Sequence, residues 1–215
     1  MMNRRLVIVW GKWGPYHFAR FQALQHAAVE RGWAVHGVQY SEGSEEYQWA
    51  DRFRSEHLTT LNAAQAETGH EPLRLARCWE SFLASFRSTV ALLPSYWPWS
   101  LQMNLQARRR GVRIVMMNES HAGTEATAGT LKRWLKRQII RRFDAALVGG
   151  KPHRRHFEAL GLPPERIFDG YDAVDNDAFA QHANAARATG SARALGLPER
   201  YFLNVGRFVP KKNLT

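Results

Sequence analysis

The sequence is poor in several features that would place a protein in a special class. Its 215 residues include a single cysteine, Cys78, so no disulfide can form within the chain and folding in a reducing compartment is expected. Near the N-terminus, two arginines precede an apolar run of only five residues, 6–10. This run is too short for a signal peptide or a membrane span, and it predicts a buried strand instead.

Metal and cofactor motifs are also missing. The nine histidines form no cluster with metal-ligand spacing, so no metal site is expected. His153 and His156 lie three positions apart among arginines, and we expect both to face solvent. No G-x-G-x-x-G fingerprint follows the first expected strand, and no acidic residue ends the second. These absences give no indication of a dinucleotide cofactor, and we expect none.

Acidic residues are scarce. There are 19 Asp and Glu against 30 Lys and Arg, and the formal net charge is +11. Most of this excess lies between Gln106 and His156, where thirteen basic residues stand against three acidic ones. A patch of this kind attracts a polyanion, either the anionic face of a membrane or nucleic acid.

What the sequence does contain is a repeated alternation of short apolar runs with longer helical segments. At 45% apolar residues, the chain has ample material for a buried core. The alternation predicts an α/β fold, a Rossmann-like parallel sheet with helices on both faces. Expected strands lie at residues 6–10, 34–40, 57–62, 88–95, 112–118, 145–148 and after the paired prolines 163–164, and the clearest helices at 16–31, 72–87 and 131–143.

Residues 143–179 form the clearest unit of this pattern. The apolar run 145–148 is closed by Gly149-Gly150, and a polar helix then starts at Lys151-Pro152. Proline is well tolerated in the first turn of a helix, and Gly161 stands where a left-handed cap is expected at its end. A second apolar run follows, so the segment is one βαβ unit.

The order DAALVGG…HF..LGLPPERIFDGYDAVDNDAF, followed by YFLNVGRFVPKKN, resembles the family 4 (group 1) glycosyltransferases of the GT-B fold. The resemblance implies an acceptor-side domain at 1–175, and at 176–215 a connector and the truncated start of the donor-binding domain, with a new strand at 201–206. It also implies retaining transfer of a sugar from a nucleotide-sugar to an acceptor, such as a lipid-linked saccharide or polysaccharide precursor. This piece is expected to be inactive alone.

The resemblance also points to residues that bind the donor. We expect Arg207 and Lys212, in GRFVPKKN, to bind the diphosphate of the nucleotide. Gly11 and Gly14 lie between the first expected strand and a helix N-terminus, where backbone N–H groups and the helix dipole favour phosphate. From the residues alone, Gly14 reads as a tight-turn residue.

Polar residues follow the fifth expected strand at the carboxyl edge, where open α/β sheets bind ligands. In the resembled family, the loop here often presents a polar residue, frequently histidine, to the transferred sugar. Glu119 and His121 are therefore the expected catalytic residues. On spacing alone, a solvated loop with helix-capping residues is an equal alternative.

The segment 131–143 predicts an amphipathic helix. Its apolar stripe, expected to pack on the core, is Leu131, Trp134, Leu135, Ile139 and Phe143. Its basic side, expected to face an anionic membrane, includes Lys132, Arg133, Lys136 and Arg137. Trp97 and Trp99, after the fourth expected strand, are assigned to the same membrane or acceptor surface, with core packing under a loop as the alternative.

Other classes stay open. A non-catalytic protein that binds an acceptor or lipid is one alternative, and a GT-B enzyme that uses nucleotide-sugars differently, such as a sugar epimerase, is another. A basic nucleic-acid binder is disfavoured because no recognised binding module is present. The expected location is the cytoplasm, peripheral to the inner membrane face.

Overall fold

The computed structural model describes residues 4–41, 55–61, 72–94, 98–125, 129–198 and 200–206. The chain forms two compact units, Met1–Val174 and Asp175–Thr215. That the second unit begins a donor-binding domain stays a prediction.

The first unit is built on one seven-stranded sheet with the order β3-β2-β1-β4-β5-β6-β7. All six neighbouring pairs are parallel. The strands are β1 (Arg4–Trp10), β2 (Trp33–Gln39), β3 (Leu58–Thr60), β4 (Val90–Leu93), β5 (Arg113–Asn118), β6 (Ala145–Val148) and β7 (Ile167–Asp169). The parallel α/β sheet that the sequence predicts is therefore confirmed.

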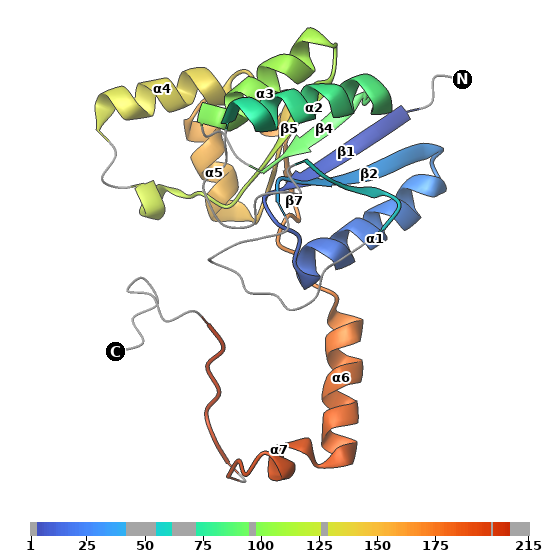
Figure 1. Cartoon of the computed structure of the whole chain (residues 1–215). Helices are drawn as coiled ribbons and strands as arrows, with labels where there is room; N and C mark the ends of the chain where they lie inside the picture. The colour runs from blue at the N-terminus through green and yellow to red at the C-terminus, as the bar shows by residue number, and fades with distance from the viewer. Residues whose placement is uncertain are drawn as a thin grey trace. The chain divides into compact units, whose positions relative to one another are not determined.

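Helices cover both faces of this sheet. They are α1 (Pro15–Val29), α2 (Pro72–Phe86), α3 (Pro98–Arg109), α4 (Thr130–Ile140) and α5 (Lys151–Ala159), with short 3₁₀ turns η1 (Ala122–Glu125) and η2 (Pro164–Arg166). Figure 1 shows α1 on one side of the sheet and α2 and α3 on the other. The expected helices on both faces are thus present.

Alternate residues of each strand feed two separate cores. In β1, Val7 and Val9 join the cluster that includes Trp79 of α2, whereas Ile8 and Trp10 join the cluster around α1. Side chains of a strand alternate between the two faces, and both faces of this sheet are covered. This double burial explains why the strands read as continuous apolar runs instead of an apolar and polar alternation.

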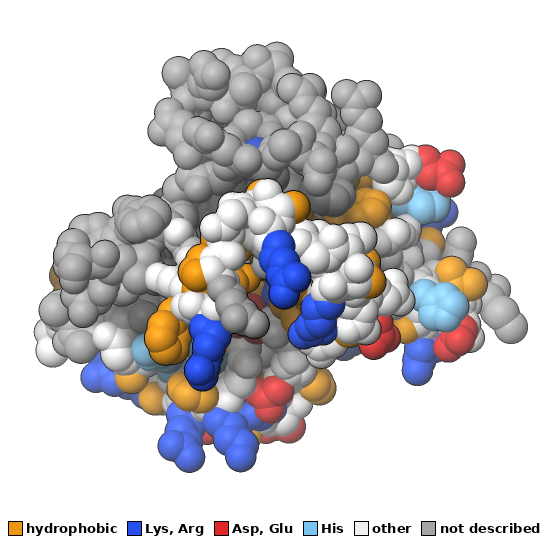
Figure 2. All heavy atoms as spheres, turned by 90° about the horizontal axis from the view of Figure 1, so that it is seen from below, with side chains coloured by type: hydrophobic (Ala, Val, Ile, Leu, Met, Phe, Trp, Pro, Cys, Tyr) orange, Lys and Arg blue, Asp and Glu red, His pale blue; other side chains and the backbone are white. Residues whose placement is uncertain are grey.

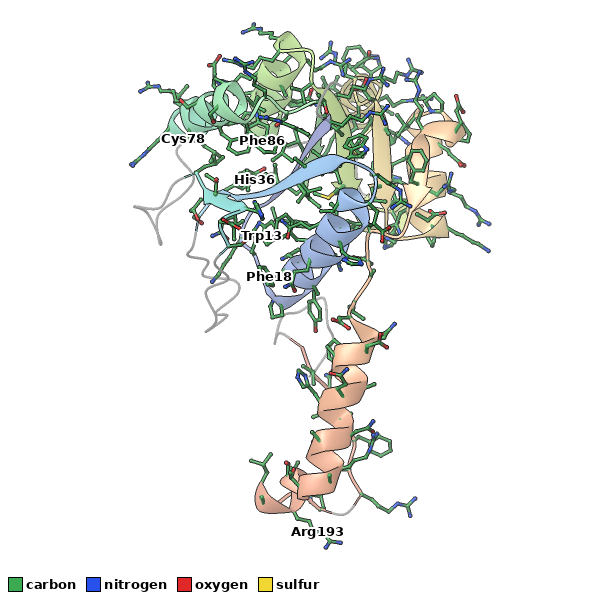
Figure 3. The ribbon with its side chains drawn as sticks, turned by 90° about the vertical axis from the view of Figure 1, so that its right-hand side faces the viewer. Trp13, Phe18, His36, Cys78, Phe86 and Arg193 are labelled. Carbon is green, nitrogen blue, oxygen red and sulfur yellow. The ribbon has the colours of Figure 1, made fainter. Side chains whose placement is uncertain are left out.

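Trp13 fixes the loop after β1 against the sheet. Its indole N–H donates to the carbonyl oxygen of Val38 at 3.0 Å, and its backbone N–H donates to Oε1 of Gln39 at 3.1 Å. The ring is 2% exposed and lies edge-on to Phe21 of α1, with 4.8 Å between ring centroids. Figure 3 shows Trp13 on the α1 side of the sheet and His36 on the α2 side. The loop is therefore held by strand β2 and by helix α1.

The βαβ unit at 143–179 is confirmed in detail. Strand β6 ends before Gly149-Gly150, α5 begins at Lys151 with proline in its first turn, and β7 follows η2. Gly161, just after α5, has φ +94°, the left-handed conformation that glycine adopts at low cost.

Two expectations about solvent contact are wrong. His156 is only 7% exposed, because this side of α5 faces the sheet, where Phe157 is also buried. The apolar stripe of the basic helix packs on the core only at its C-terminal end. Its exposed apolar residues are Leu131, Trp134 and Leu135 of α4.

The second unit contains α6 (Asn176–Thr189) and α7 (Ser191–Ala194). The Asp175 carboxylate caps α6 by accepting the backbone N–H of Ala178 at 2.9 Å. The strand expected at 201–206 is not formed, and all of its residues are exposed. A strand needs a neighbour to pair its backbone groups, and the described part of this unit contains no other strand.

We predict that Gly37→Ala destabilises the first unit. An added Cβ at residue 37 of β2 would lie 2.6 Å from two carbons of the Trp13 ring, and this ring is pinned by its hydrogen bond to Val38. Overpacking of this kind costs roughly 1–3 kcal/mol. Urea unfolding measures the change in unfolding free energy.

The matched control for this test is Gly11→Ala. An added Cβ at residue 11 has its nearest neighbour at an ordinary 3.8 Å, on the Tyr40 ring. We expect the control to change stability little. Equal unfolding free energies for Gly37→Ala and the parent protein would show that the Trp13 ring can move aside.

Candidate functional site

The strand order places a candidate site at the carboxyl edge of the sheet. The order reverses between β1 and β4, and open α/β sheets bind ligands outside the carboxyl ends of their strands at such a point. The chain leaves this edge after β1, β5, β6 and β7; polar side chains stand in the loops after β1, β5 and β7, and the loop after β6 is Gly149-Gly150. Because all the strands are parallel, residues far apart in sequence meet there.

Glu119 and Asp172 form a hydrogen-bonded carboxyl pair at this edge. Glu119 follows β5, and Asp172 follows β7. Two carboxyl groups can hydrogen-bond only when one of them carries a proton, so the approach of Asp172 favours the protonated form of Glu119 and helps to raise its pKa. The structure thus joins the predicted residue Glu119 to a carboxylate that the sequence analysis did not select.

Arg20 of α1 holds this pair from a third element. Its guanidinium lies 3.6 Å from Oδ1 of Asp172, and its Nε donates to the carbonyl oxygen of Ala173 at 2.6 Å. The guanidinium also stacks over the Tyr171 ring, 5.2 Å from its centroid. Only 18% of the Arg20 side chain is exposed, so the positive charge is fixed in place.

Tyr171 links the end of β7 to the end of β1. The indole N–H of Trp10 donates to the Tyr171 hydroxyl at 3.2 Å, and both residues are buried. Burial is the main cause that raises the pKa of Tyr171, so its hydroxyl stays protonated. This contact positions the neighbouring Asp172 beside Glu119.

The pKa of Glu119 is raised above its ordinary 4.5. The largest cause is partial loss of solvent around the carboxyl group, followed by the hydrogen bond to Asp172 and the repulsion from its charge. The nearby Arg20 acts in the opposite direction and lowers the pKa, but does not cancel these effects. Glu119 is therefore a carboxyl group that releases its proton less readily than an ordinary glutamate, and it lies beside a second carboxyl group and a fixed cation.

Gly149, at the end of β6, makes room for this arrangement. A Cβ at residue 149 would lie 2.7 Å from Oδ2 of Asp172 and 3.2 Å from the ring of His153. The His153 ring in turn lies 5.6 Å from the ring of His121. A larger residue at position 149 would therefore displace the Asp172 carboxyl group from its present place.

His121 stands at the same edge as Glu119. Its Nδ1 accepts the backbone N–H of Gly123 at 3.2 Å, at the start of η1, which is the capping contact considered from the sequence. With Nδ1 engaged in this way, Nε2 is the ring nitrogen that carries the proton of a neutral His121. A role for His121 in the reaction stays a prediction.

The loop that holds Gly11 and Gly14 lies at the same edge. Gly14 has φ −118° and ψ 179°, an extended conformation open to any residue, so it does not form a glycine-specific turn. Its N–H donates to Nδ1 of His17 at 3.0 Å, which leaves this N–H unavailable to a phosphate. Burial, then the charge of Arg20, lowers the pKa of His17 to about 4, so the imidazole is neutral at physiological pH.

Several predicted residues lie outside the described residues. Arg207, Lys212 and Trp97 belong to this group. Trp99 lies in the first turn of α3 and not in a loop, because Pro98 begins the helix. The donor-binding and aromatic predictions therefore stay predictions.

Sequence reasoning missed Arg20, Tyr171 and Asp172. A usable signal was present for the last two, because both directly follow the expected seventh strand and parallel strands end at one edge. Arg20 gave no such signal. It is one of several charged residues on a helix, and only the packing of α1 against the sheet brings it to Asp172.

Other parts of the described structure offer less than the carboxyl edge. Within the described ranges, no three His, Cys, Asp or Glu side chains form a group that could hold a metal ion. A hollow of about 510 Å³ lies near the starts of β1 and β2, lined by residues that include Arg5, Trp33, His36, His57 and Phe86. Its imidazole at residue 36 has a pKa lowered to about 4, mainly by burial. No carboxylate lines this hollow, so it offers less chemistry than the carboxyl edge.

Comparison with known proteins finds a likeness in fold but none in sequence. The sequence matches no family model and no curated protein. Among solved structures, the chain is similar to UDP-N-acetylglucosamine 2-epimerase from Rickettsia bellii, with a TM-score of 0.58 and 14% identity over 92% of this chain and 52% of that one. The likeness shows the fold alone.

Two further epimerase structures show the same likeness. UDP-GlcNAc 2-epimerase from Methanocaldococcus jannaschii gives a TM-score of 0.51 and 10% identity over 77% of this chain and 45% of that one. UDP-GlcNAc 2-epimerase from Neisseria meningitidis, bound to UDP-GlcNAc, gives a TM-score of 0.51 and 8% identity over 77% of this chain and 46% of that one. The chain spans about half the length of these proteins. The GT-B type of fold is thus supported, and membership of glycosyltransferase family 4 stays a prediction.

We predict that Glu119→Gln gains stability relative to the parent protein as pH rises. Folded Glu119 binds its proton more tightly than the unfolded chain, whose ordinary pKa is 4.5, so stability is lost as pH rises from that value. Glutamine cannot ionise and avoids this loss. Urea unfolding between about pH 4 and pH 8 measures the difference in unfolding free energy.

The control for this pH series is Glu165→Gln, an exposed carboxyl on η2. We expect its stability difference from the parent protein to stay nearly constant. A constant difference for Glu119→Gln as well would contradict the carboxyl pair.

Proposed function

We propose that this chain is the N-terminal part of a glycosyltransferase that moves a sugar, with retention, from a nucleotide-sugar to an acceptor hydroxyl. The observation that supports this most is the cluster of Glu119, Asp172 and Arg20 at the carboxyl edge. It stands in a fold shared with solved UDP-GlcNAc 2-epimerases. The sequence resemblance to family 4 glycosyltransferases supplies the reaction type.

The cluster suits a sugar because its groups both donate and accept hydrogen bonds. Glu119 donates when it carries its proton, whereas the Asp172 carboxylate accepts, and a sugar ring presents hydroxyl groups that do both. Arg20 orients Asp172 through their ion pair. We assign Glu119 to the hydroxyl groups of the sugar, with Asp172 as its positioning partner and His121 as a second contact.

Transfer breaks the bond between the anomeric carbon and the diphosphate oxygen and forms one to the acceptor oxygen. The acceptor hydroxyl gives its proton to the departing diphosphate oxygen, on which negative charge develops as its bond to the anomeric carbon breaks. Fixed positive charge at the diphosphate stabilises this transition state. We assign this task to Arg207 and Lys212, with the loop at Gly11 and the positive end of α1 on the opposite side. No covalent sugar intermediate on Glu119 is part of the proposal.

A second candidate function is epimerisation of a nucleotide-sugar. It is favoured by the three solved neighbours and by the carboxyl pair, because inverting a carbon requires a proton to be removed and returned. Incubation of a longer protein, one that continues through a complete second domain, with UDP-GlcNAc in deuterium oxide and without acceptor separates the two. An epimerase exchanges a carbon-bound proton for deuterium, whereas a glycosyltransferase does not.

We predict that nucleotide binding needs residues beyond Thr215. Calorimetric titration of UDP, GDP and their sugar derivatives is made into this chain and into a longer protein that continues through a complete second domain. Binding by the longer protein alone is expected, because half a donor cleft provides half the contacts. Absence of binding to both proteins would contradict the donor assignment and favour an acceptor-binding or lipid-binding protein.

In the longer protein, we predict that Glu119→Gln and Asp172→Asn each lower the transfer rate. Loss of one preorganised polar group that acts on the transition state costs roughly a hundredfold to a thousandfold. Sugar transfer to a saccharide acceptor is followed by product analysis, with Glu165→Gln as the control. Transfer rates within a factor of two of the parent enzyme in both variants would remove the cluster from the reaction.

A further inference from the structure

Helix α4 carries an apolar surface that the core does not use. Leu131, Trp134 and Leu135 are 70%, 55% and 48% exposed, whereas Ile140, in the last turn of α4, and Phe143, just beyond it, are almost fully buried. One short helix therefore divides its large apolar residues between the core and solvent. The sequence pattern alone assigned all of them to one buried stripe.

The helical repeat explains this division. Successive residues are about 100° apart around an α-helix, so Leu131, Trp134 and Leu135 share one side within roughly 100°. Ile140 lies about 180° from Leu131 by the same count. The helix thus has two apolar sides, and packing of its C-terminal end on the sheet turns the first side outward.

Two basic side chains, Lys132 and Arg137, flank the outward side, each about 60° beyond its edge by the same count, and Arg133 lies on the opposite side of the helix. Lys132, Arg133 and Arg137 are exposed, and none of them has an ion-pair partner within the described ranges. The wider segment from Gln106 to His156 has ten more basic than acidic residues. In contrast, the face drawn in Figure 2 mixes basic, acidic and apolar side chains. The outward side of α4 therefore combines apolar anchors with positive charge that has no acidic ion-pair partner in the described part of the chain.

These features favour an anionic lipid bilayer as the occupant. A helix of eleven residues is about 16 Å long, and an amphipathic helix of this kind lies in the interface with its apolar side among the acyl chains. Within the described ranges, no helix is both long enough and apolar enough to cross a membrane. Tryptophan prefers the headgroup level, and flanking Lys and Arg pair with anionic headgroups.

Other occupants suit this surface less well. A second copy of the chain would bring two strongly positive segments together, which like-charge repulsion opposes. A nucleic acid would contact the basic side chains but would leave the leucines exposed, because phosphate backbones offer them no apolar partner. Both remain outcomes that the experiment separates.

We propose that the outward side of α4, formed by Leu131, Trp134 and Leu135 and flanked by Lys132 and Arg137, binds an anionic lipid bilayer by shallow insertion, with Arg133 adding positive charge from the opposite side of the helix. Both parts are needed, because the charge attracts the helix to the surface and the apolar residues hold it there. The inference does not depend on the sugar-transfer proposal, and its test uses no catalytic readout.

The test is flotation of the whole 215-residue chain with vesicles of phosphatidylcholine containing about 30% phosphatidylglycerol, a composition that presents anionic surface charge. We expect binding to these vesicles, weaker binding at high salt and little binding to pure phosphatidylcholine. The triple variant Leu131→Ser, Trp134→Ser, Leu135→Ser should lose roughly tenfold or more in partitioning. Charge reversal at residues 132, 133 and 137 to Glu should abolish binding.

Matched controls carry the same substitutions elsewhere. Val29, Leu73 and Leu105 are also exposed apolar residues, on α1, α2 and α3, and their triple Ser variant should bind vesicles like the parent chain. Circular dichroism checks that each variant is folded. Brominated lipid should quench tryptophan fluorescence in the parent chain and less so in Trp134→Phe, which reports insertion directly.

Three results would overturn the proposal. The first is equal vesicle binding by the α4 and control variants. The second is steep, salt-sensitive binding to RNA or DNA without vesicle binding, which would assign the basic side to nucleic acid. The third is a dimer in analytical ultracentrifugation that the α4 triple Ser variant dissociates, which would make this side a protein interface.

Discussion

The parallel sheet buried on both faces is the constraint on which the other features of this protein depend. Parallel strands end at one edge, so the loops after β1, β5, β6 and β7 meet although they are up to 160 residues apart, as the hydrogen bond between Trp10 and Tyr171 shows. Burial of both faces leaves this edge as the place where polar groups reach solvent without interrupting the core. The position of the candidate site thus follows from strand direction, and the particular residues determine its chemistry.

At this edge, the positive charge of Arg20 offsets the repulsion between two neighbouring carboxyl groups. Two carboxyl groups that face each other repel when both are ionised, so the approach of Asp172 favours the protonated form of Glu119, while the cation of Arg20 stabilises the ionised form. The contact of Tyr171 with Trp10 and the missing side chain of Gly149 set the position of Asp172. Strained or costly polar groupings of this type are more common at functional sites than elsewhere, which is why the cluster carries the functional proposal.

Much of this architecture is visible in the sequence, and the parts that are not have physical reasons. Apolar runs such as 6–10 and 145–148 identify buried strands because both of their faces are covered, and Gly161 marks a helix end because its left-handed conformation favours glycine. Glu119 could be selected because it follows a strand directly. Arg20 could not be, because its role depends on how α1 packs. The outward side of α4 was misjudged for the same reason, since periodicity shows that a helix has apolar residues but not which of them meet the sheet.

Saccharide acceptors are expected to bind at the carboxyl edge, and NMR shift mapping tests this most directly. Two-dimensional ¹H–¹⁵N spectra of the labelled chain are recorded during titration with saccharide acceptors. We expect the shifts to concentrate on the Trp10 indole, Glu119, Gly149 and Asp172 and their neighbours in these loops. Shifts centred on the hollow near Arg5 and His36 at the opposite end of the sheet, with none at the carboxyl edge, would contradict it.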